Sequence, residues 1–246
     1  MIRSLGLGLF AAATLSALAM TIGVGLSWQK NVFVQEYWQG GKGFYALANH
    51  TDAAVAITVA PQRGGDKLAG PWQVPARGVL EVPVDGLPAA GLLAWNLGDG
   101  SSLGLLEAPR APTVGDAKVV VSTYGLSGSG GRDEKVWVET ETPRVHVGDV
   151  ITLQVKFAAP AAELMVKKEK LAGLKVVSDT LKVVEQPDGF TVDVSPVKAG
   201  TVQTVTISFT APAAEKPAMQ IVDTWLWTAK GKAGHGVTRG IVVLPK

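Results

Sequence analysis

The first 27 residues constrain the rest of the chain more than any other feature. No charged side chain occurs from Ser4 to Ser27; Arg3 is the only charge before this run, and Lys30 is the first after it. An α-helix rises about 1.5 Å per residue, so about 20 apolar residues cross a hydrocarbon layer of about 30 Å. The run is therefore long enough to span a membrane.

Two interpretations of this run compete. A cleavable secretory signal has a basic start, an apolar centre and a small-x-small cleavage site, and Ala17-Leu18-Ala19 would serve as that site. However, the sequence stays apolar beyond Ala19, and Trp28 follows where an interfacial aromatic would anchor a spanning helix. We expect residues 1–28 to be a retained transmembrane helix that contacts the lipid bilayer, with a cleaved signal as the alternative. A lipoprotein signal is excluded because the chain has no cysteine.

Small residues recur within the run at helical spacing. Gly8, Ala12 and Ser16 lie four residues apart, so on a helix they form one stripe that a second transmembrane helix can approach closely. The alternative is that Gly and Ala are simply common in such segments. Because Arg3 should stay in the cytoplasm under the positive-inside rule, we expect a single-pass protein of a bacterial inner membrane with its globular part in the periplasm.

Composition predicts an all-β protein. The sequence is rich in Val and Thr, it contains 29 Gly and 14 Pro, and few long stretches have helical periodicity. The formal net charge of +2 argues against a nucleic-acid binder, which normally has a strong basic excess. The absence of cysteine excludes disulfides, zinc-thiolate sites and covalently attached c-type haem.

Short strand-like runs fill the region that follows the anchor. In the first part they are residues 31–37, 44–48, 53–60, 79–84, 92–97, 103–106 and 118–123. Turn-forming residues separate them, for example Asn49-His50-Thr51-Asp52 and Gly98-Asp99-Gly100-Ser101. This spacing is typical of a β-sandwich. Residues 126–132 then have the Gly/Ser-rich composition of a flexible linker.

The second part repeats the pattern, and Pro143 confines its neighbour to a sheet edge. Its strand-like runs are residues 136–141, 152–157, 174–177, 180–185, 190–194, 201–210, 221–229 and 237–244, whereas 163–174 is compatible with a short helix or an edge strand. We therefore predict a first β-sandwich domain over 29–125, a linker over 126–132 and a second sandwich domain over 133–246.

Two segments of the second part carry a resemblance. Val-His-Val-Gly-Asp-Val-Ile-Thr-Leu-Gln-Val starts at Val145, and Ala-Gly-Thr-Val-Gln-Thr-Val-Thr-Ile-Ser-Phe-Thr-Ala-Pro starts at Ala199. Together they resemble bacterial immunoglobulin-like or fibronectin type III-like domains, and Tyr-Ala-Leu-Ala-Asn-His-Thr-Asp from Tyr45 is similar in style. The resemblance implies two tandem immunoglobulin-like sandwiches. It implies no function, because this fold hosts many.

No catalytic, cofactor-binding or metal site is predicted. His50, His146 and His235 each lie in or beside a predicted turn or edge, without ligand spacing, and we expect structural, solvent-facing side chains. The glycine-rich stretches match neither a dinucleotide fingerprint nor a P-loop. Asn49-His50-Thr51 is a glycosylation sequon that carries little weight in a bacterial protein.

Tryptophans are the remaining candidates for partner binding. Trp225 and Trp227 stand on one face of a predicted strand. If this face points outward, the two side chains would form a binding hot spot or a sugar-stacking platform. If it points inward, they are ordinary core residues, which is the interpretation that we favour. Trp28 and Trp38 lie close behind the anchor and could touch lipid headgroups or a membrane partner. We expect Trp72 and Trp95 to pack in the core or at an edge of the first domain.

These features predict a non-catalytic, membrane-anchored accessory or scaffold subunit that binds other subunits of a larger membrane complex. Respiratory and photosynthetic assemblies are possible hosts, and we expect the subunit itself to carry no cofactor. The first alternative is a secreted or surface adhesion or carbohydrate-binding protein with a cleaved leader. A soluble periplasmic chaperone and an undetected hydrolase are weaker alternatives.

Overall fold

Every regular element that the structure describes is a β-strand. The computed structural model describes residues 22–23, 26–62, 65–111, 120–123, 136–140, 144–160, 162–169, 171–227 and 234–246. The predicted all-β class is therefore confirmed. We call residues 22–111 the first half and residues 136–246 the second half; β10 lies between them in the chain.

The first half contains nine strands in the described ranges. They are β1 (Ile22–Gly23), β2 (Leu26–Gln29), β3 (Val32–Gln39), β4 (Lys42–Asn49), β5 (Val55–Pro61), β6 (Ala69–Val74), β7 (Gly78–Pro83), β8 (Leu92–Leu97) and β9 (Ser102–Glu107). The remaining strands are β10 (Val120–Thr123), β11 (Val136–Thr140), β12 (Arg144–His146), β13 (Val150–Phe157), β14 (Glu163–Lys167), β15 (Lys175–Val177), β16 (Val183–Gln186), β17 (Gly189–Asp193), β18 (Gln203–Thr210), β19 (Ala218–Trp227) and β20 (Gly234–Leu244).

The end of the predicted transmembrane segment is extended. Ile22 and Gly23 pair in parallel with Leu105 and Leu106 of β9, and β2 pairs with β3 in antiparallel fashion. The rest of the predicted helix lies outside the described residues. Within the described ranges, no helix has the length and apolar character needed to cross a bilayer.

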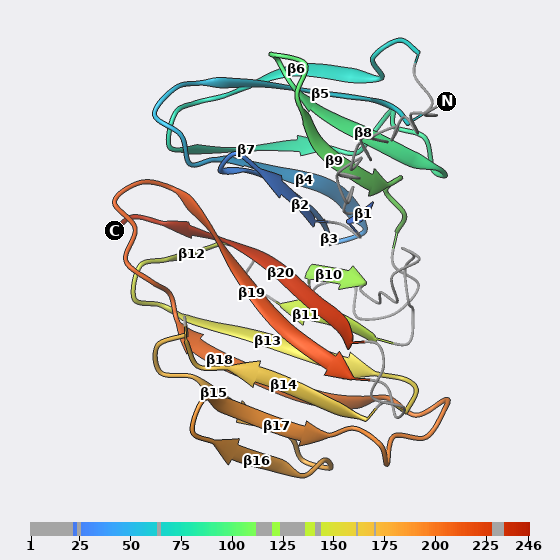
Figure 1. The fold of residues 1–246 in the computed structure, drawn as a ribbon, viewed down its shortest axis with the longest axis vertical. Helices are drawn as coiled ribbons and strands as arrows, with labels where there is room; N and C mark the ends of the chain where they lie inside the picture. The colour runs from blue at the N-terminus through green and yellow to red at the C-terminus, as the bar shows by residue number, and fades with distance from the viewer. Residues whose placement is uncertain are drawn as a thin grey trace, which may run out of the picture.

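The strands form three sheets (Figure 1). A five-stranded sheet has the order β1-β9-β8-β5-β6, and a six-stranded sheet has the order β12-β20-β19-β14-β17-β16. The third sheet has nine strands in the order β15-β18-β13-β11-β10-β3-β4-β7, with β2 added beside β3. Strands of both halves therefore belong to this nine-stranded sheet.

The connection through β10 is narrow. β4 pairs with β3 along its whole length, so β2 and β10 share the opposite edge of β3. β2 occupies residues Val32 to Gln35 of that edge, and β10 joins it only where Val121 lies opposite Trp38. On its other side β10 pairs with β11 over four residues. The predicted linker 126–132 and the domain boundary within it lie outside the described residues.

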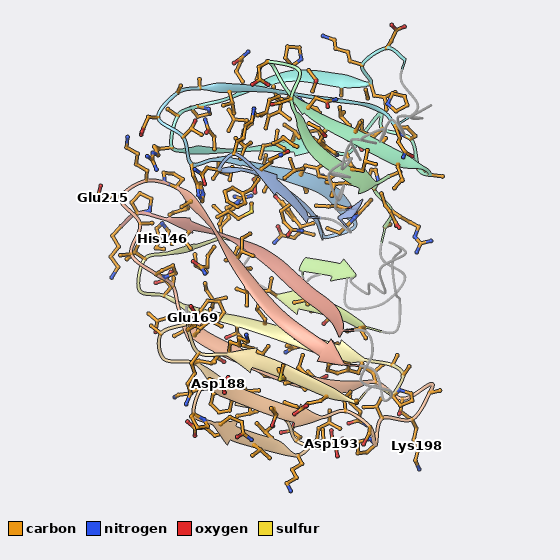
Figure 2. The ribbon with its side chains drawn as sticks, viewed as in Figure 1. His146, Glu169, Asp188, Asp193, Lys198 and Glu215 are labelled. Carbon is orange, nitrogen blue, oxygen red and sulfur yellow. The ribbon has the colours of Figure 1, made fainter. Side chains whose placement is uncertain are left out.

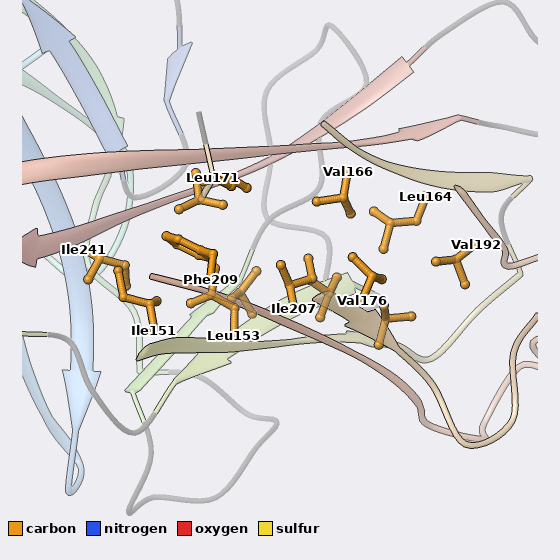
Figure 3. Close-up of a cluster of buried hydrophobic side chains, with 14 of the residues drawn as sticks. Ile151, Leu153, Leu164, Val166, Leu171, Val176, Val192, Ile207, Phe209 and Ile241 are labelled. Atoms are coloured by element: carbon orange, nitrogen blue, oxygen red, sulfur yellow. The ribbon is translucent and has the colours of Figure 1, made fainter. Parts of the chain in front are cut away.

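Alternation along the strands creates two main cores. On β3 and β4, Val32, Val34, Tyr45 and Leu47 point into the core of the first half, which also contains the fully buried Trp95. The core of the second half lies between the six-stranded sheet and β13, β15 and β18. Figure 3 shows Leu164 and Val166 of β14 facing Ile207 of β18 and Val176 of β15 across it. This two-sheet packing supports the sandwich-like architecture predicted from the strand pattern.

The ambiguous segment 163–174 begins with a strand. Leu164 and Val166 alternate into the second core, whereas Lys167 at the end of β14 is exposed. The period of two is the strand period rather than the helical one, and β14 pairs with both β17 and β19. The strand interpretation of this stretch is therefore confirmed for Glu163–Lys167, but the expected edge position is wrong, because β14 has a paired strand on each side.

Candidate functional site: the junction between the two halves

The two halves meet along an apolar contact that neither main core includes. Tyr37, Ala46 and Ala48 on β3 and β4 pack with Met219 of β19 and Val242 of β20, and all five are buried. They occupy the strand positions that alternate with those filling the two main cores. β3 and β4 therefore use one face for the core of the first half and the other for the second half. We call this contact the junction.

A buried amide bridges the junction at its centre. Gln35 is only 1% exposed, and its Oε1 accepts a hydrogen bond of 3.0 Å from the backbone N–H of Gly240. Its Nε2 donates to the carbonyl of Glu36. A Cβ on residue 240 would come 2.6 Å from Met219 Sδ and 3.3 Å from Gln35 Oε1. Glycine at 240 therefore lets β20 approach β3 closely enough for this bond.

A three-residue polar cluster closes one end of the junction. Tyr37 donates from Oη to Glu81 Oε1 at 2.6 Å, and Arg144 of the second half donates from Nε to the same oxygen at 2.8 Å. Arg144 Nη2 also pairs with Glu81 Oε2. Burial and the hydrogen bond to Glu81 raise the pKa of Tyr37 to about 12, so it stays a neutral donor. The guanidinium engages both carboxylate oxygens, a geometry specific to arginine.

The loop after β4 supplies the third bridge. Asn49 is fully buried, and its Nδ2 donates to the carbonyls of Ala53 at 2.8 Å and Pro75 at 3.1 Å. Its Oδ1 accepts from the backbone N–H of Thr51 at 2.9 Å, which confirms the predicted side-chain-to-backbone turn. This loop holds His50, whose Nε2 accepts a 2.8 Å hydrogen bond from the N–H of Met219. The sequon asparagine is therefore a buried structural residue.

One expectation about a single residue is overturned at the junction. His50 was expected to face solvent, and this is wrong: it is half-buried between the halves because β19 packs over its loop. His146 is exposed as expected, with 58% of its side chain accessible, and the side chain of His235 lies outside the described part. Trp72 and Trp95 stack with ring centroids 5.9 Å apart, as predicted for the first core.

The predicted partner-binding residues are spread over different elements. Gly8, Ala12 and Ser16 lie outside the described residues. Trp28 lies in β2, opposite Phe33, and its side chain is outside the described part. Trp38 lies at the end of β3, where its Nε1 donates to Glu36 Oε1 at 2.7 Å. Its indole N–H is therefore used within the first half.

Trp225 and Trp227 lie on β19, between β14 and β20. Their register partners on β20 are Gly236 and Gly234, and those on β14 are Met165 and Glu163. Their positions share the parity of Met219, on the junction side, whereas Val222 of opposite parity belongs to the second core. The side chains of both tryptophans are outside the described part.

The junction was not predicted from sequence. Gln35 and Tyr37 look like the solvent-facing positions of an alternating strand, and nothing local marks a second sheet on that face. The one available signal was Gly240 within the predicted strand 237–244, since an isolated glycine in a strand often marks a close backbone approach. In the described ranges, no group of three or more His, Asp or Glu side chains is placed to hold a metal ion.

The chain has little likeness to known proteins. No protein-family model matches the chain, and no curated protein matches it. Solved structures similar to it include the major pilin subunit of Bacillus cereus and a variant of the same pilin, each at 9% identity with a TM-score of 0.31. Each comparison covers 79% of this chain and 65% of the pilin chain. At these values the likeness carries no argument about function.

Proposed function

We propose that this chain is a non-catalytic, membrane-anchored accessory subunit that faces the periplasm and braces partner subunits of a larger membrane complex. Its halves are proposed to be immunoglobulin-like sandwiches. The observation that carries the proposal is the junction. A nine-stranded sheet shared by both halves, an apolar contact and three side-chain bridges hold the halves in one relative orientation.

A fixed orientation matters to a scaffold because it presents two binding surfaces at a constant spacing. Binding energy is then not spent on ordering one half relative to the other. Polar side chains at the junction serve this purpose: Gln35 and the Glu81–Arg144 pair join the halves, and the amide of Asn49 shapes the loop that holds His50. These uses support a structural role.

The first test is the intact mass of the native protein, extracted from membranes in mild detergent with its co-purifying chains. A full-length mass with stable partners is the expected result. A free monomer under the same conditions would refute the accessory-subunit proposal.

A pair of arginine variants tests whether the junction matters to partner binding. Arg144→Ala removes an ion pair between the halves, whereas Arg77→Ala removes the 2.8 Å pair with Asp52 inside the first half. We expect the first variant to recover less partner than the second. Equal recovery would mean that the orientation of the halves is irrelevant to binding.

One observation favours the second candidate, a secreted or surface-binding protein with a cleaved leader. β1 begins at Ile22, three residues after the small-x-small sequence ending at Ala19. Cleavage there would leave every described strand intact. This candidate would use Trp225 and Trp227 of β19 as a glycan-stacking surface.

The leader itself separates the two candidates. Ala19→Leu removes the small residue that a signal peptidase requires, and Ala12→Leu, in the middle of the run, is the matched control. The secreted candidate predicts a mature mass beginning near Met20 for the wild type and the control, and a full-length mass for Ala19→Leu. The anchored subunit predicts a full-length mass for all three.

A further inference from the structure

The hydrogen bond between His50 and Met219 fixes the protonation state of the histidine. The Met219 N–H donates to Nε2 at 2.8 Å, so Nε2 carries a lone pair, and the ring is neutral with its proton on Nδ1. The ring lies 4.6 Å from that of Phe33, and the backbone N–H of His50 donates to the carbonyl of Asn31 at 2.9 Å. The imidazole is thus held in place by its own half while it accepts from the other.

A protonated imidazole cannot make this bond. Both ring nitrogens of a histidinium are donors, so its Nε2–H and the N–H of Met219 would point at each other. Met219 is only 5% exposed, and a buried donor without an acceptor is destabilising. The cheapest relief is movement of β19 away from the loop that holds His50.

The charges around the ring come from both halves. Burial first, and then the positive charge of Arg77, hold the pKa of His50 below its ordinary value of 6.5. Arg77 is itself paired with Asp52 at 2.8 Å, and Lys216, in the loop before β19, acts electrostatically on Asp52. Glu215 is the other charge of that loop.

Some charged residues of the second half lie farther from this region. Figure 2 shows Glu215 where the halves meet, whereas Asp188, Asp193 and Lys198 lie toward the far side of the second half. The named charges near the loop are the carboxylates of Asp52 and Glu215 and the cations Arg77 and Lys216.

We infer that His50 is an acid-sensitive latch between the two halves: its protonation breaks the bond to Met219 and loosens the junction. The direction follows from linkage. A histidine released from the junction binds a proton more readily than the latched one, so the latched state loses stability as pH falls below about 6.5. The Gln35 amide and the Arg144 guanidinium do not titrate in this range, so they stay engaged and the loosening is local to one end.

Amide hydrogen exchange of the full chain tests the latch. The readout is the protection of the β19 segment containing Met219, measured at pH 7.5 and pH 5.0 and corrected for the intrinsic pH dependence of exchange. Single-proton linkage allows a loss of up to about tenfold per pH unit, and we expect a loss of several-fold or more in the wild type. Unchanged protection would overturn the inference.

Two glutamine variants isolate the responsible histidine. His50→Gln keeps an acceptor oxygen but cannot titrate, so protection of Met219 should be the same at both pH values. His146→Gln changes an exposed histidine of β12 and should behave as the wild type. A pH-dependent loss that persists in His50→Gln, or disappears in His146→Gln, would overturn the assignment.

A measurement on the wild type covers the case in which His50→Gln does not fold. The ring protons of His50 are followed by NMR over the same pH range. The inference requires a titration midpoint below about 6.5 that coincides with loss of the Met219 hydrogen bond. An ordinary midpoint with no change at the Met219 amide would refute it.

Discussion

Replacing Gln35 with leucine is the most direct test of the junction. The substitution keeps roughly the same volume, so it removes the acceptor of the Gly240 N–H without opening a large cavity. A buried N–H without a partner costs about 1–3 kcal/mol. Burial of the leucine in an apolar cluster offsets part of this, so we expect a net loss of about 1–2 kcal/mol in the free energy of unfolding.

Urea unfolding and amide exchange measure the two parts of this prediction. With a slope of about 1–3 kcal/mol per molar urea, the midpoint should fall by roughly 0.3–2 M, and the Gly240 amide should exchange faster. The matched control is Gln154→Leu on β13, because Gln154 is exposed and such changes usually stay within about 0.5 kcal/mol. Equal midpoints for the two variants, with the Gly240 amide still protected, would refute our account of the junction.

Three further predictions concern single residues. A Cβ on Gly189 would overlap the carbonyl oxygen of Val166 on the paired strand, so Gly189→Ala should lower the unfolding free energy by about 1–3 kcal/mol or more in urea. Asn49→Ala loses buried amide bonds and should cost about 2 kcal/mol, or roughly 4–8 °C in Tm by calorimetry. Ultraviolet titration should find Tyr37 ionising near pH 12; the stability that its raised pKa contributes is present below its ordinary pKa of about 10 and is lost as pH rises toward 12.

Local features of the fold could be predicted because their causes are local. Gly98-Asp99-Gly100-Ser101 joins β8 to β9 as expected, and Asp99 Oδ1 accepts from the backbone N–H of Ser101 at 2.8 Å. In contrast, β6 was missed because Gly70 and Pro71 interrupt its pattern. β6 is the last strand of its sheet, where the missing N–H of proline is tolerated.

The junction could not be predicted because its partners are distant in sequence. Gln35 and Gly240 are 205 positions apart, and His50 and Met219 are 169 apart. Along the start of β3, Val32 and Val34 alternate with Gln35, and this pattern predicts solvent on the side of the glutamine. Only the packing of β19 and β20 on that side turns a polar residue such as Gln35 into a buried one.

The two N-terminal strands also determine how close an anchored protein must stand to the membrane. Because Ile22 pairs with Leu105, a helix that starts at Ser4 can extend no further than residue 21, or about 27 Å. Such a helix would roughly match a hydrocarbon layer of about 30 Å and would leave no spacer before the first half.

Inserting six Gly/Ser residues between Thr21 and Ile22 would add up to about 20 Å of reach. If the anchor holds the scaffold against its partners, co-purification should fall. If the leader is cleaved, the insertion becomes a free N-terminal tail and binding should not change.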